Sequence, residues 1–354
     1  MTRLSCEYEI AEPKLSKLLL VDLLDPHEKN LTAAYQKFSQ SSQEDAPISY
    51  AAEWLLDNFF LVQQTIRQVR EDMPNGYYQQ LPKLKNTVWV HYPRVFALAQ
   101  EAIVYSQERF DIDLLSHFMQ AFQTQTPLTM GEIWAFPTML RLGILSSLAK
   151  IFAEVIDVDI YPTPPLIDNP LVQSYIVTLR MLAIQDWKIF FESVSLIEQI
   201  LRQDPADVYI TMDFDTRDSY RKVIEQIARV SKHVEEDVAN RVVTLSQEAT
   251  PHSRQAHVGY YLIGDGRSQL EDGFNYSPSW PLALRRWLLA HPTPAYLVSI
   301  GLMTCLLLFV FINYAAAIGG SLLQILSVGA LTLLPITAIV TGFVNWIVTH
   351  TLAP

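Results

Sequence analysis

The last part of the chain, residues 287–354, contains no Asp, Glu, Lys or Arg. Within it, residues 294–320 include about 23 consecutive apolar or neutral residues, enough at ~1.5 Å per residue to cross the ~30 Å hydrocarbon core of a bilayer. A second run of similar length follows at 322–348, after a short Gly-Gly-Ser turn. A buried hairpin in a soluble protein is the alternative. Two uncharged runs in tandem favour a transmembrane helical hairpin, with spans at about 295–317 and 322–348.

Two arginines, Arg285 and Arg286, directly precede the first apolar run, whereas the turn between the runs carries no charge. Because positively charged flanks stay in the cytoplasm, this arrangement predicts that both termini of the chain are cytoplasmic. Trp287 and Trp346 lie near the expected span ends, where amphipathic rings settle at the membrane interface. These four residues are the expected membrane-edge anchors, and the lipid bilayer is the first expected partner.

The part of the chain before the apolar runs is acidic. All 26 Lys and Arg and all 37 Asp and Glu occur at or before Arg286, with a net charge of −11. Nucleic acid needs clustered positive charge, so it is excluded as an expected partner. Cys6 and Cys305 are too few for a disulfide framework, and the first 17 residues lack the apolar core of a secretion signal. We therefore expect a cytoplasmic domain with reduced thiols.

Residues 53–73 show the clearest helical periodicity of this domain. Ser49 is the expected N-cap, and Pro74 with the following Asn-Gly supplies the stop signal. One apolar stripe runs along the segment at spacings of three and four residues. The stripe consists of Leu55, Phe59, Val62, Ile66, Val69 and Met73. The opposite face is polar, so this helix is expected to pack against other helices in water.

Other segments follow the same pattern, no run alternates with a period of two, and only 12 glycines are present. The predicted fold class is therefore all-α: a multi-helix cytoplasmic domain followed by the membrane hairpin. The further expected helices are 25–40, 92–110, 111–126, 129–158, 171–203, 216–234 and 235–249. Four prolines at 159–170 mark an expected joint. The predicted domains are 1–158, 159–286 and 287–354.

No complete active site is evident in the sequence. Asp213 and Asp215 have the spacing of a metal-binding pair in glycosyltransferases, but they lie between two predicted helices, where capping is favoured. Arg285-Arg286-Trp287 is similar to an acceptor-binding pair of sugar polymerases, yet membrane anchoring is the favoured role. The eight histidines show no metal-binding spacing. We therefore assign no catalytic, cofactor-binding or metal residue.

Adjacent tyrosines, Tyr77 and Tyr78, follow the helix at 53–73. Pro74, Gly76 and Pro82 predict a non-helical loop around them. Tyrosine combines apolar area with a hydrogen-bonding tip, which suits protein contact, so this pair is the candidate partner contact. The alternative, favoured somewhat more, is that both rings cover the core of their own domain.

Several ordered blocks resemble the amino-terminal region of the cyclic β-1,2-glucan synthases, and together they cover nearly the whole chain. They include "SYAAEWLLDNFFLVQQTIRQVREDMPNGYYQQLPKL", "TPLTMGEIWAFPTMLRLGIL", "DWKIFFESVSLIEQILRQDPADVYITMDFDTRDSYRKVIEQIA" and "VGYYLIGDGRSQLE". The resemblance implies a multi-pass inner-membrane protein. In that family a UDP-glucose-dependent glycosyltransferase domain follows this region, and cyclising and phosphorylase domains lie further along. The joint at 159–170 is shorter here than the family pattern.

Two functions follow from these observations. In the first, the chain is the accessory and membrane-anchoring region of such a synthase, whose transferase and downstream domains are its expected partners. In the second, it is a free-standing helical interaction or scaffold protein on the membrane. Neither reading makes the chain alone catalytic or gives it a cofactor.

Overall fold

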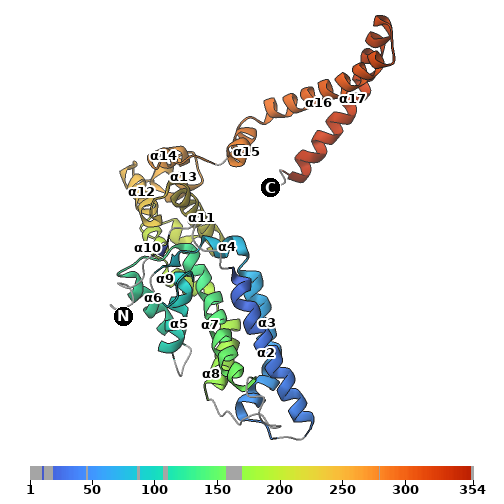
Figure 1. Cartoon of the computed structure of the whole chain (residues 1–354). Helices are drawn as coiled ribbons and strands as arrows, with labels where there is room; N and C mark the ends of the chain where they lie inside the picture. Colours follow the sequence, from blue (N-terminus) through green and yellow to red (C-terminus); the bar gives the residue numbers. More distant parts are fainter. Residues whose placement is uncertain are drawn as a thin grey trace. The chain divides into compact units, whose positions relative to one another are not determined.

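The computed structural model describes residues 10–11, 19–44, 47–85, 88–106, 111–156, 170–278 and 280–351. They form two compact units, residues 1–276 and residues 277–354 (Figure 1). Helices dominate both units, which confirms the predicted all-α fold. Within the described ranges the one sheet is minimal: β1 (Ile10–Ala11) pairs antiparallel with β2 (Lys83–Leu84).

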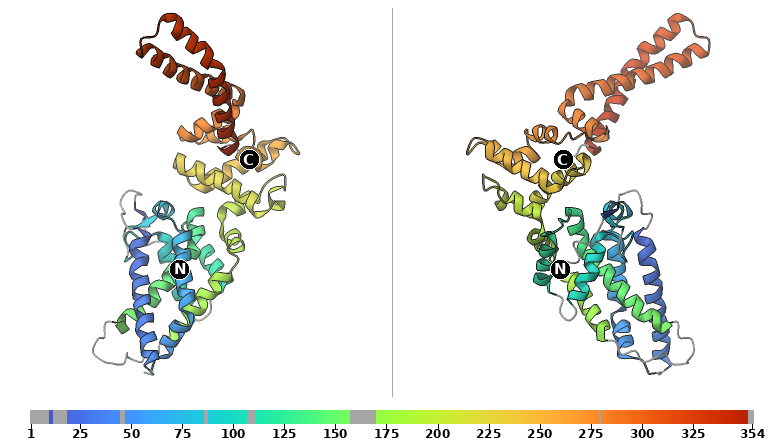
Figure 2. Two further views of the ribbon diagram at one scale, coloured as in Figure 1. Left: turned by 90° about the vertical axis from the view of Figure 1, so that its right-hand side faces the viewer. Right: turned by 60° about the vertical axis from the view of Figure 1, so that its left-hand side comes forward.

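The first unit is a layered bundle in which long helices lie beside one another, as both views of Figure 2 show. Its α-helices are α2 (Leu20–Gln43), α3 (Tyr50–Asp72), α4 (Asn75–Gln80), α5 (Arg94–Tyr105), α6 (Ile112–Gln123), α7 (Met130–Ile156), α8 (Pro170–Ile184), α9 (Trp187–Val194), α10 (Leu196–Leu201), α11 (Phe214–Ser231), α12 (Glu235–Glu248), α13 (Val258–Leu262) and α14 (Arg267–Gly273). Two short 3-10 turns, Tyr209–Thr211 and Arg254–Ala256, complete the unit.

The central helix is α7, which packs against α2, α3 and α5. It begins with a capping box: Thr129 Oγ1 accepts from the backbone N–H of Glu132 at 3.2 Å, and the Glu132 carboxylate accepts from the backbone N–H of Thr129 at 3.0 Å. By length and composition α7 could cross a membrane, but 83% of its most apolar window is buried inside the unit. It is therefore a core helix.

The helix α3 confirms the prediction made from its apolar stripe. Ser49 Oγ accepts from the backbone N–H of Ala52 at 3.2 Å, as expected of an N-cap. All six stripe residues, from Leu55 to Met73, are buried. The periodic pattern therefore gave both the buried face and the start of this helix.

Some of the predicted helix starts are wrong. The helix expected at 25–40 begins at Leu20 and includes Pro26. The carboxylate of Asp22 accepts from the backbone N–H of Leu19 and stabilises this earlier start. The helix expected to begin at Thr216 begins at Phe214, with Asp213 as its N-cap.

The single helix expected at 171–203 is also wrong, because α8, α9 and α10 replace it. Asp186 caps α9 by accepting from the backbone N–H of Lys188 at 2.9 Å, and Ser195 caps α10 by accepting from the N–H of Glu198 at 3.2 Å. Both side chains compete for backbone groups and so favour helix ends over a continuous helix.

The expected proline-rich joint at 159–170 lies outside the described residues except for Pro170. The division of the helical part at 158–159 thus stays a prediction. Among the described helices, α8 lies after this joint and packs against α3 and α7 from before it.

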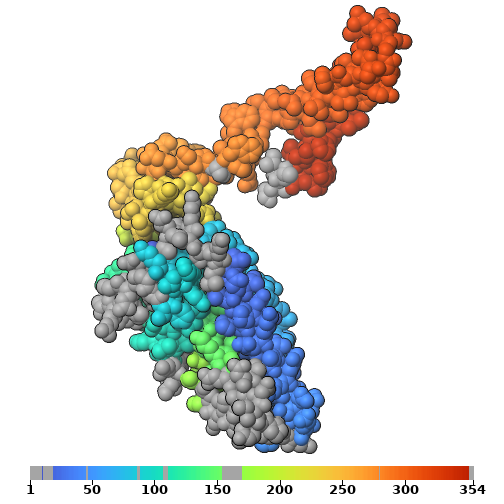
Figure 3. Space-filling model, viewed as in Figure 1, coloured from blue at the N-terminus to red at the C-terminus, as the bar shows by residue number. Residues whose placement is uncertain are grey.

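The second unit contains α15 (Trp280–Ala290), α16 (Pro292–Ala317) and α17 (Leu322–Thr351). The helices α16 and α17 lie against each other as an antiparallel hairpin (Figure 3). Gly319 in the turn has φ +80°, a conformation that glycine adopts without the steric cost of a Cβ. At the other end of the hairpin, the Tyr296 hydroxyl donates to Asn345 Oδ1 at 2.9 Å.

Candidate functional site

The outer surface of the hairpin formed by α16 and α17 is apolar and exposed. The most apolar windows of α16 and α17 are only 6% and 11% buried, although both helices are long and apolar enough to cross a membrane. The exposed side chains on these helices include Leu302, Leu306, Phe309, Leu331, Leu334 and Ile339. Soluble proteins rarely leave so much contiguous apolar surface in water. The exposed apolar side chains of the hairpin therefore need an apolar environment around them.

The structure brings two of the predicted membrane-edge anchors to the same end of the hairpin. Trp287 precedes α16 and stacks on His291 at 5.4 Å, while Trp346 lies near the end of α17 beside His350 at 4.8 Å. Both tryptophans are exposed. Arg285 and Arg286 lie on α15 beside Trp287. The open end of the hairpin therefore has the aromatic and cationic composition of a membrane interface.

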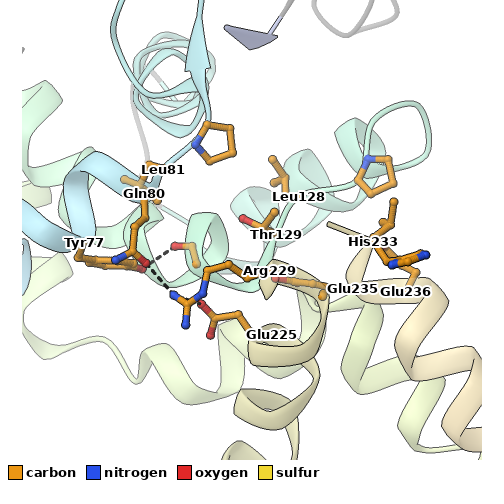
Figure 4. Close-up of a pocket in the computed structure, with 15 residues that line it drawn as sticks. Tyr77, Gln80, Leu81, Leu128, Thr129, Glu225, Arg229, His233, Glu235 and Glu236 are labelled. Carbon is orange, nitrogen blue, oxygen red and sulfur yellow. Dashed lines mark hydrogen bonds and ion pairs between the residues drawn. The ribbon is translucent and has the colours of Figure 1, made fainter. Parts of the chain in front are cut away.

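A cavity of about 370 Å³ lies in the first unit, between α4, the segment before α7, and the junction of α11 with α12 (Figure 4). Tyr77 borders it and donates its hydroxyl to the Gly131 carbonyl at 2.5 Å. Beside Tyr77, Arg229 donates to Gln80 Oε1 at 2.8 Å. These two bonds join α4 to α7 and α11, so the cavity marks the place where the long bundle meets the later helices.

The predicted non-helical loop at Tyr77 and Tyr78 is wrong. Both residues lie in α4, because the Pro74 carbonyl accepts from their backbone N–H groups at 2.9 and 3.1 Å and starts a new helical turn. The Tyr78 side chain is 0% exposed, and Lys83 Nζ lies 4.9 Å from the centre of its ring. Tyr78 thus packs in the core and offers no surface to a partner. Contact through the half-buried Tyr77 stays a prediction.

Glu235, at the start of α12, lines the same cavity and caps the start of α7. Its Oε2 accepts from the backbone N–H of Met130 at 2.8 Å. Burial, and to a lesser extent the nearby charges of Glu225 and Glu236, raise the pKa of this carboxyl to about 8. The protonated form is therefore favoured at neutral pH in the folded protein.

Asp213 and Asp215 lie at the start of α11, as its N-cap residue and in its first turn. Asp213 caps α11, and its hydrogen bond with Thr216 lowers the pKa of its carboxyl. Asp215 forms an exposed ion pair with Lys188 at 3.4 Å. In the described parts of the chain, no group of three His, Cys, Asp or Glu side chains could hold a metal ion. The arrangement supports the capping role.

A buried charge cluster around Glu198 was not predicted from the sequence. Its carboxylate accepts from Arg217 and Arg221 at 2.6 Å each, and from the Tyr209 hydroxyl at 2.7 Å. Burial opposes ionisation of Glu198, but the bonds from Tyr209 and Arg202 and the charges of the arginines outweigh it and lower its pKa. The cluster joins α10, the turn at Tyr209 and α11. Its partners are up to 23 residues apart in sequence, beyond the reach of any local motif.

A second buried network, also missed, joins Asp204, His257 and Tyr220 beside a cleft of about 830 Å³. His257 Nδ1 lies 2.7 Å from Asp204 Oδ2, and its Nε2 lies 3.3 Å from the Tyr220 hydroxyl. Asp204 also accepts from three backbone N–H groups. A Cβ at Gly259 would collide with Tyr220 and His257. The network is satisfied within the unit and fixes the position of α13.

No family model matches this chain. It is similar to the cyclic β-(1,2)-glucan synthase NdvB of Rhizobium meliloti (strain 1021), with 27% identity over an alignment that covers 72% of this chain. The same alignment covers 12% of NdvB, so the chain spans only a small part of that relative. The resemblance predicted from the sequence blocks is thereby confirmed: this chain is similar, over most of its length, to a fragment of a cyclic β-1,2-glucan synthase.

Proposed function

We propose that this chain is the accessory and membrane-anchoring region of a cyclic β-1,2-glucan synthase-like protein. The observation that carries the proposal is the hairpin of α16 and α17, whose apolar surface is left exposed. The similarity to NdvB supports the same function. In this proposal the hairpin crosses the inner membrane and holds the helical unit at its cytoplasmic face.

The charge distribution supports this orientation. Arg285 and Arg286 are the last charged residues before the hairpin, and the turn at Gly319 is uncharged. The positive-inside rule then keeps both termini in the cytoplasm. Glucose transfer from UDP-glucose would belong to other domains, since the aspartates with metal-ligand spacing in this chain serve as a cap and in a surface ion pair.

The test uses a bacterial strain that lacks its cyclic glucan synthase and expresses the remaining synthase domains separately. Cyclic glucan should form when the chain is co-expressed, and the chain should remain in the membrane fraction after alkaline extraction. A Leu306→Arg, Leu334→Arg variant should reduce both, because an arginine at a span centre costs ~2.5–3.5 kcal/mol on insertion scales. Ile263→Arg, on an exposed residue of the first unit, is the matched control.

The outcomes separate the two functions that the sequence left open. Membrane retention with restored glucan synthesis supports the accessory role. Membrane retention with no effect on glucan synthesis contradicts it and favours a free-standing membrane scaffold. Full recovery of the chain in the soluble fraction contradicts the anchoring role itself.

A further inference from the structure

The short helix α15 has a surface that its own unit does not cover. No residue of α15 is buried, and among the described elements its main contact is with α16. Trp280, Leu284 and Trp287 are all exposed. In water this composition would leave a second apolar surface uncovered, in addition to that of the hairpin.

Four large apolar residues of α15, including both tryptophans, lie along one face. Trp280, Leu284, Trp287 and Leu288 have the spacing i, i+4, i+7 and i+8, which places them along one side of an α-helix. At about 100° per residue, Arg285 and Arg286 fall on the opposite half. Leu282 and Leu289 lie between the arginines, so the apolar area extends around part of that half as well.

The helix is also separated from the span that follows. His291 has φ −128° and ψ 59°, which is not helical, and it is the N-cap of α16. Pro292 follows and lacks a backbone N–H, so the hydrogen-bond ladder of α15 cannot continue through it. The chain can therefore change direction between Ala290 and Pro292, and α15 need not continue the line of the span.

The two charged residues of α15 itself are both positive. No Asp or Glu occurs after Asp272, and Arg285 and Arg286 are the last two basic residues of the chain. An acidic protein surface could attract these arginines, but it would leave the exposed tryptophans uncovered. The cytoplasmic leaflet of a membrane offers anionic headgroups and an apolar layer directly beneath them. Amphipathic helices with tryptophan on the apolar face and arginine on the polar face occupy that boundary.

We infer that α15 lies in the plane of the membrane surface and binds anionic phospholipid through Arg285 and Arg286, with Trp280, Leu284 and Trp287 inserted among the acyl chains. The inference rests on the proposed function, because it requires α16 and α17 to be in the bilayer. It adds a lipid preference and a third, non-spanning membrane element.

The test measures label depth in the full chain, with Cys6→Ser and Cys305→Ser, reconstituted in vesicles of mixed phosphatidylcholine and phosphatidylglycerol. Single cysteines carry a fluorophore at position 284 (Leu284→Cys) or, as the hairpin reference, at position 306 (Leu306→Cys). Nitroxide lipids quench the fluorophore from shallow or deep positions. Shallow nitroxides should quench position 284 more than deep ones, and the order should reverse at position 306.

The lipid preference is tested in the Leu284→Cys protein by adding Arg285→Gln and Arg286→Gln. Each arginine should favour the surface-bound state by roughly fivefold in anionic membranes. Shallow quenching at position 284 should therefore fall in the double variant, and also in vesicles of phosphatidylcholine alone. Arg254→Gln removes an exposed charge from the first unit and should leave the quenching unchanged.

Each result decides a separate point. If position 306 is quenched by deep nitroxides but position 284 by neither, the in-plane helix is wrong while the proposed anchoring function stands. If position 306 is not quenched, the anchoring function fails, and the inference fails with it. Shallow quenching at position 284 that ignores both arginines and anionic lipid contradicts the lipid preference.

Discussion

Arg94 Nη2 lies 2.6 Å from Glu132 Oε2, and the two side chains are only 3% and 0% exposed. Arg94 Nε also donates to Glu132 Oε1 at 2.8 Å, so the pair is bidentate. Arg94 is the first residue of α5, and Glu132 belongs to the first turn of α7. A buried bidentate pair at this point fixes the starts of two core helices against each other.

Arg94→Met should destabilise the protein by about 3–5 kcal/mol, because it leaves the carboxylate of Glu132 buried without its charged partner. The double variant Arg94→Met, Glu132→Met should recover part of this loss, since replacing both partners of a buried pair with apolar residues is often tolerated. The measurement is the free energy of unfolding in denaturant. A double variant that is less stable than Arg94→Met would contradict this view of the pair.

Substitutions of Tyr78 test whether its ring packs in the core. Its hydroxyl is buried and has no hydrogen-bond partner among the described residues. Tyr78→Phe should therefore leave the protein at least as stable, because burying an unsatisfied polar group costs ~1–3 kcal/mol. Tyr78→Ala should cost about 3–5 kcal/mol, as truncation of a buried aromatic ring does. Equal thermal stability of the Ala variant and the parent would show that the ring is not a core residue.

Glu235 predicts a dependence of stability on pH. Its pKa is about 8 in the folded protein, above the ordinary value of 4.5. Between these values the folded state holds the proton that the unfolded state has lost, so stability falls as pH rises from about 4.5 to about 8. The loss is at most ~1.4 kcal/mol per pH unit.

Glu235→Gln should remove this loss of stability. The free energy of unfolding of the variant should therefore rise relative to that of the parent across that pH range, and should remain higher at higher pH. Glu235→Ala should also lose the slope, but it should be less stable than the Gln variant at every pH, since the N–H of Met130 loses its acceptor. The measurement is the free energy of unfolding against pH. Parallel curves for the parent and Glu235→Gln would contradict the raised pKa.

The described positions of Asp213 and Asp215 predict the behaviour of the chain towards UDP-glucose. Asp213 caps a helix and Asp215 pairs with Lys188 at the surface, so neither is arranged to hold a metal against a diphosphate. The purified chain in lipid should incorporate no labelled glucose. Incorporation that disappears in an Asp213→Asn, Asp215→Asn variant would overturn the capping assignment.

Strong periodic and capping signals could be read from the sequence. The stripe from Leu55 to Met73, the Ser49 cap and the Thr129–Glu132 capping box each depend on residues within a few positions of one another. The hairpin was predictable for a related reason, since its two apolar runs contain no charge. Local patterns of this kind are set by helix geometry alone.

Features that depend on distant partners could not be read in the same way. Glu198 on α10 meets Arg217 and Arg221 on α11 because both helices pack against α12, and His257 meets Asp204 from 53 residues away. The helix breaks at Asp186 and Ser195 were not predicted for another reason. The side chains of these two residues cap new helices inside a segment whose apolar pattern looks continuous. At Tyr78, the Pro74 carbonyl starts a short helix where proline and glycine indicated a loop.

The central claim is that the second unit anchors the chain with both termini in the cytoplasm. The most direct measurement fuses a cytoplasm-active and a periplasm-active reporter, in turn, to each terminus and to the turn at Gly319 in an intact bacterial cell. Cytoplasmic signals at both termini and a periplasmic signal at the turn are the predicted result. A cytoplasmic signal at the turn as well would mean that α16 and α17 do not cross the membrane, and would contradict the claim.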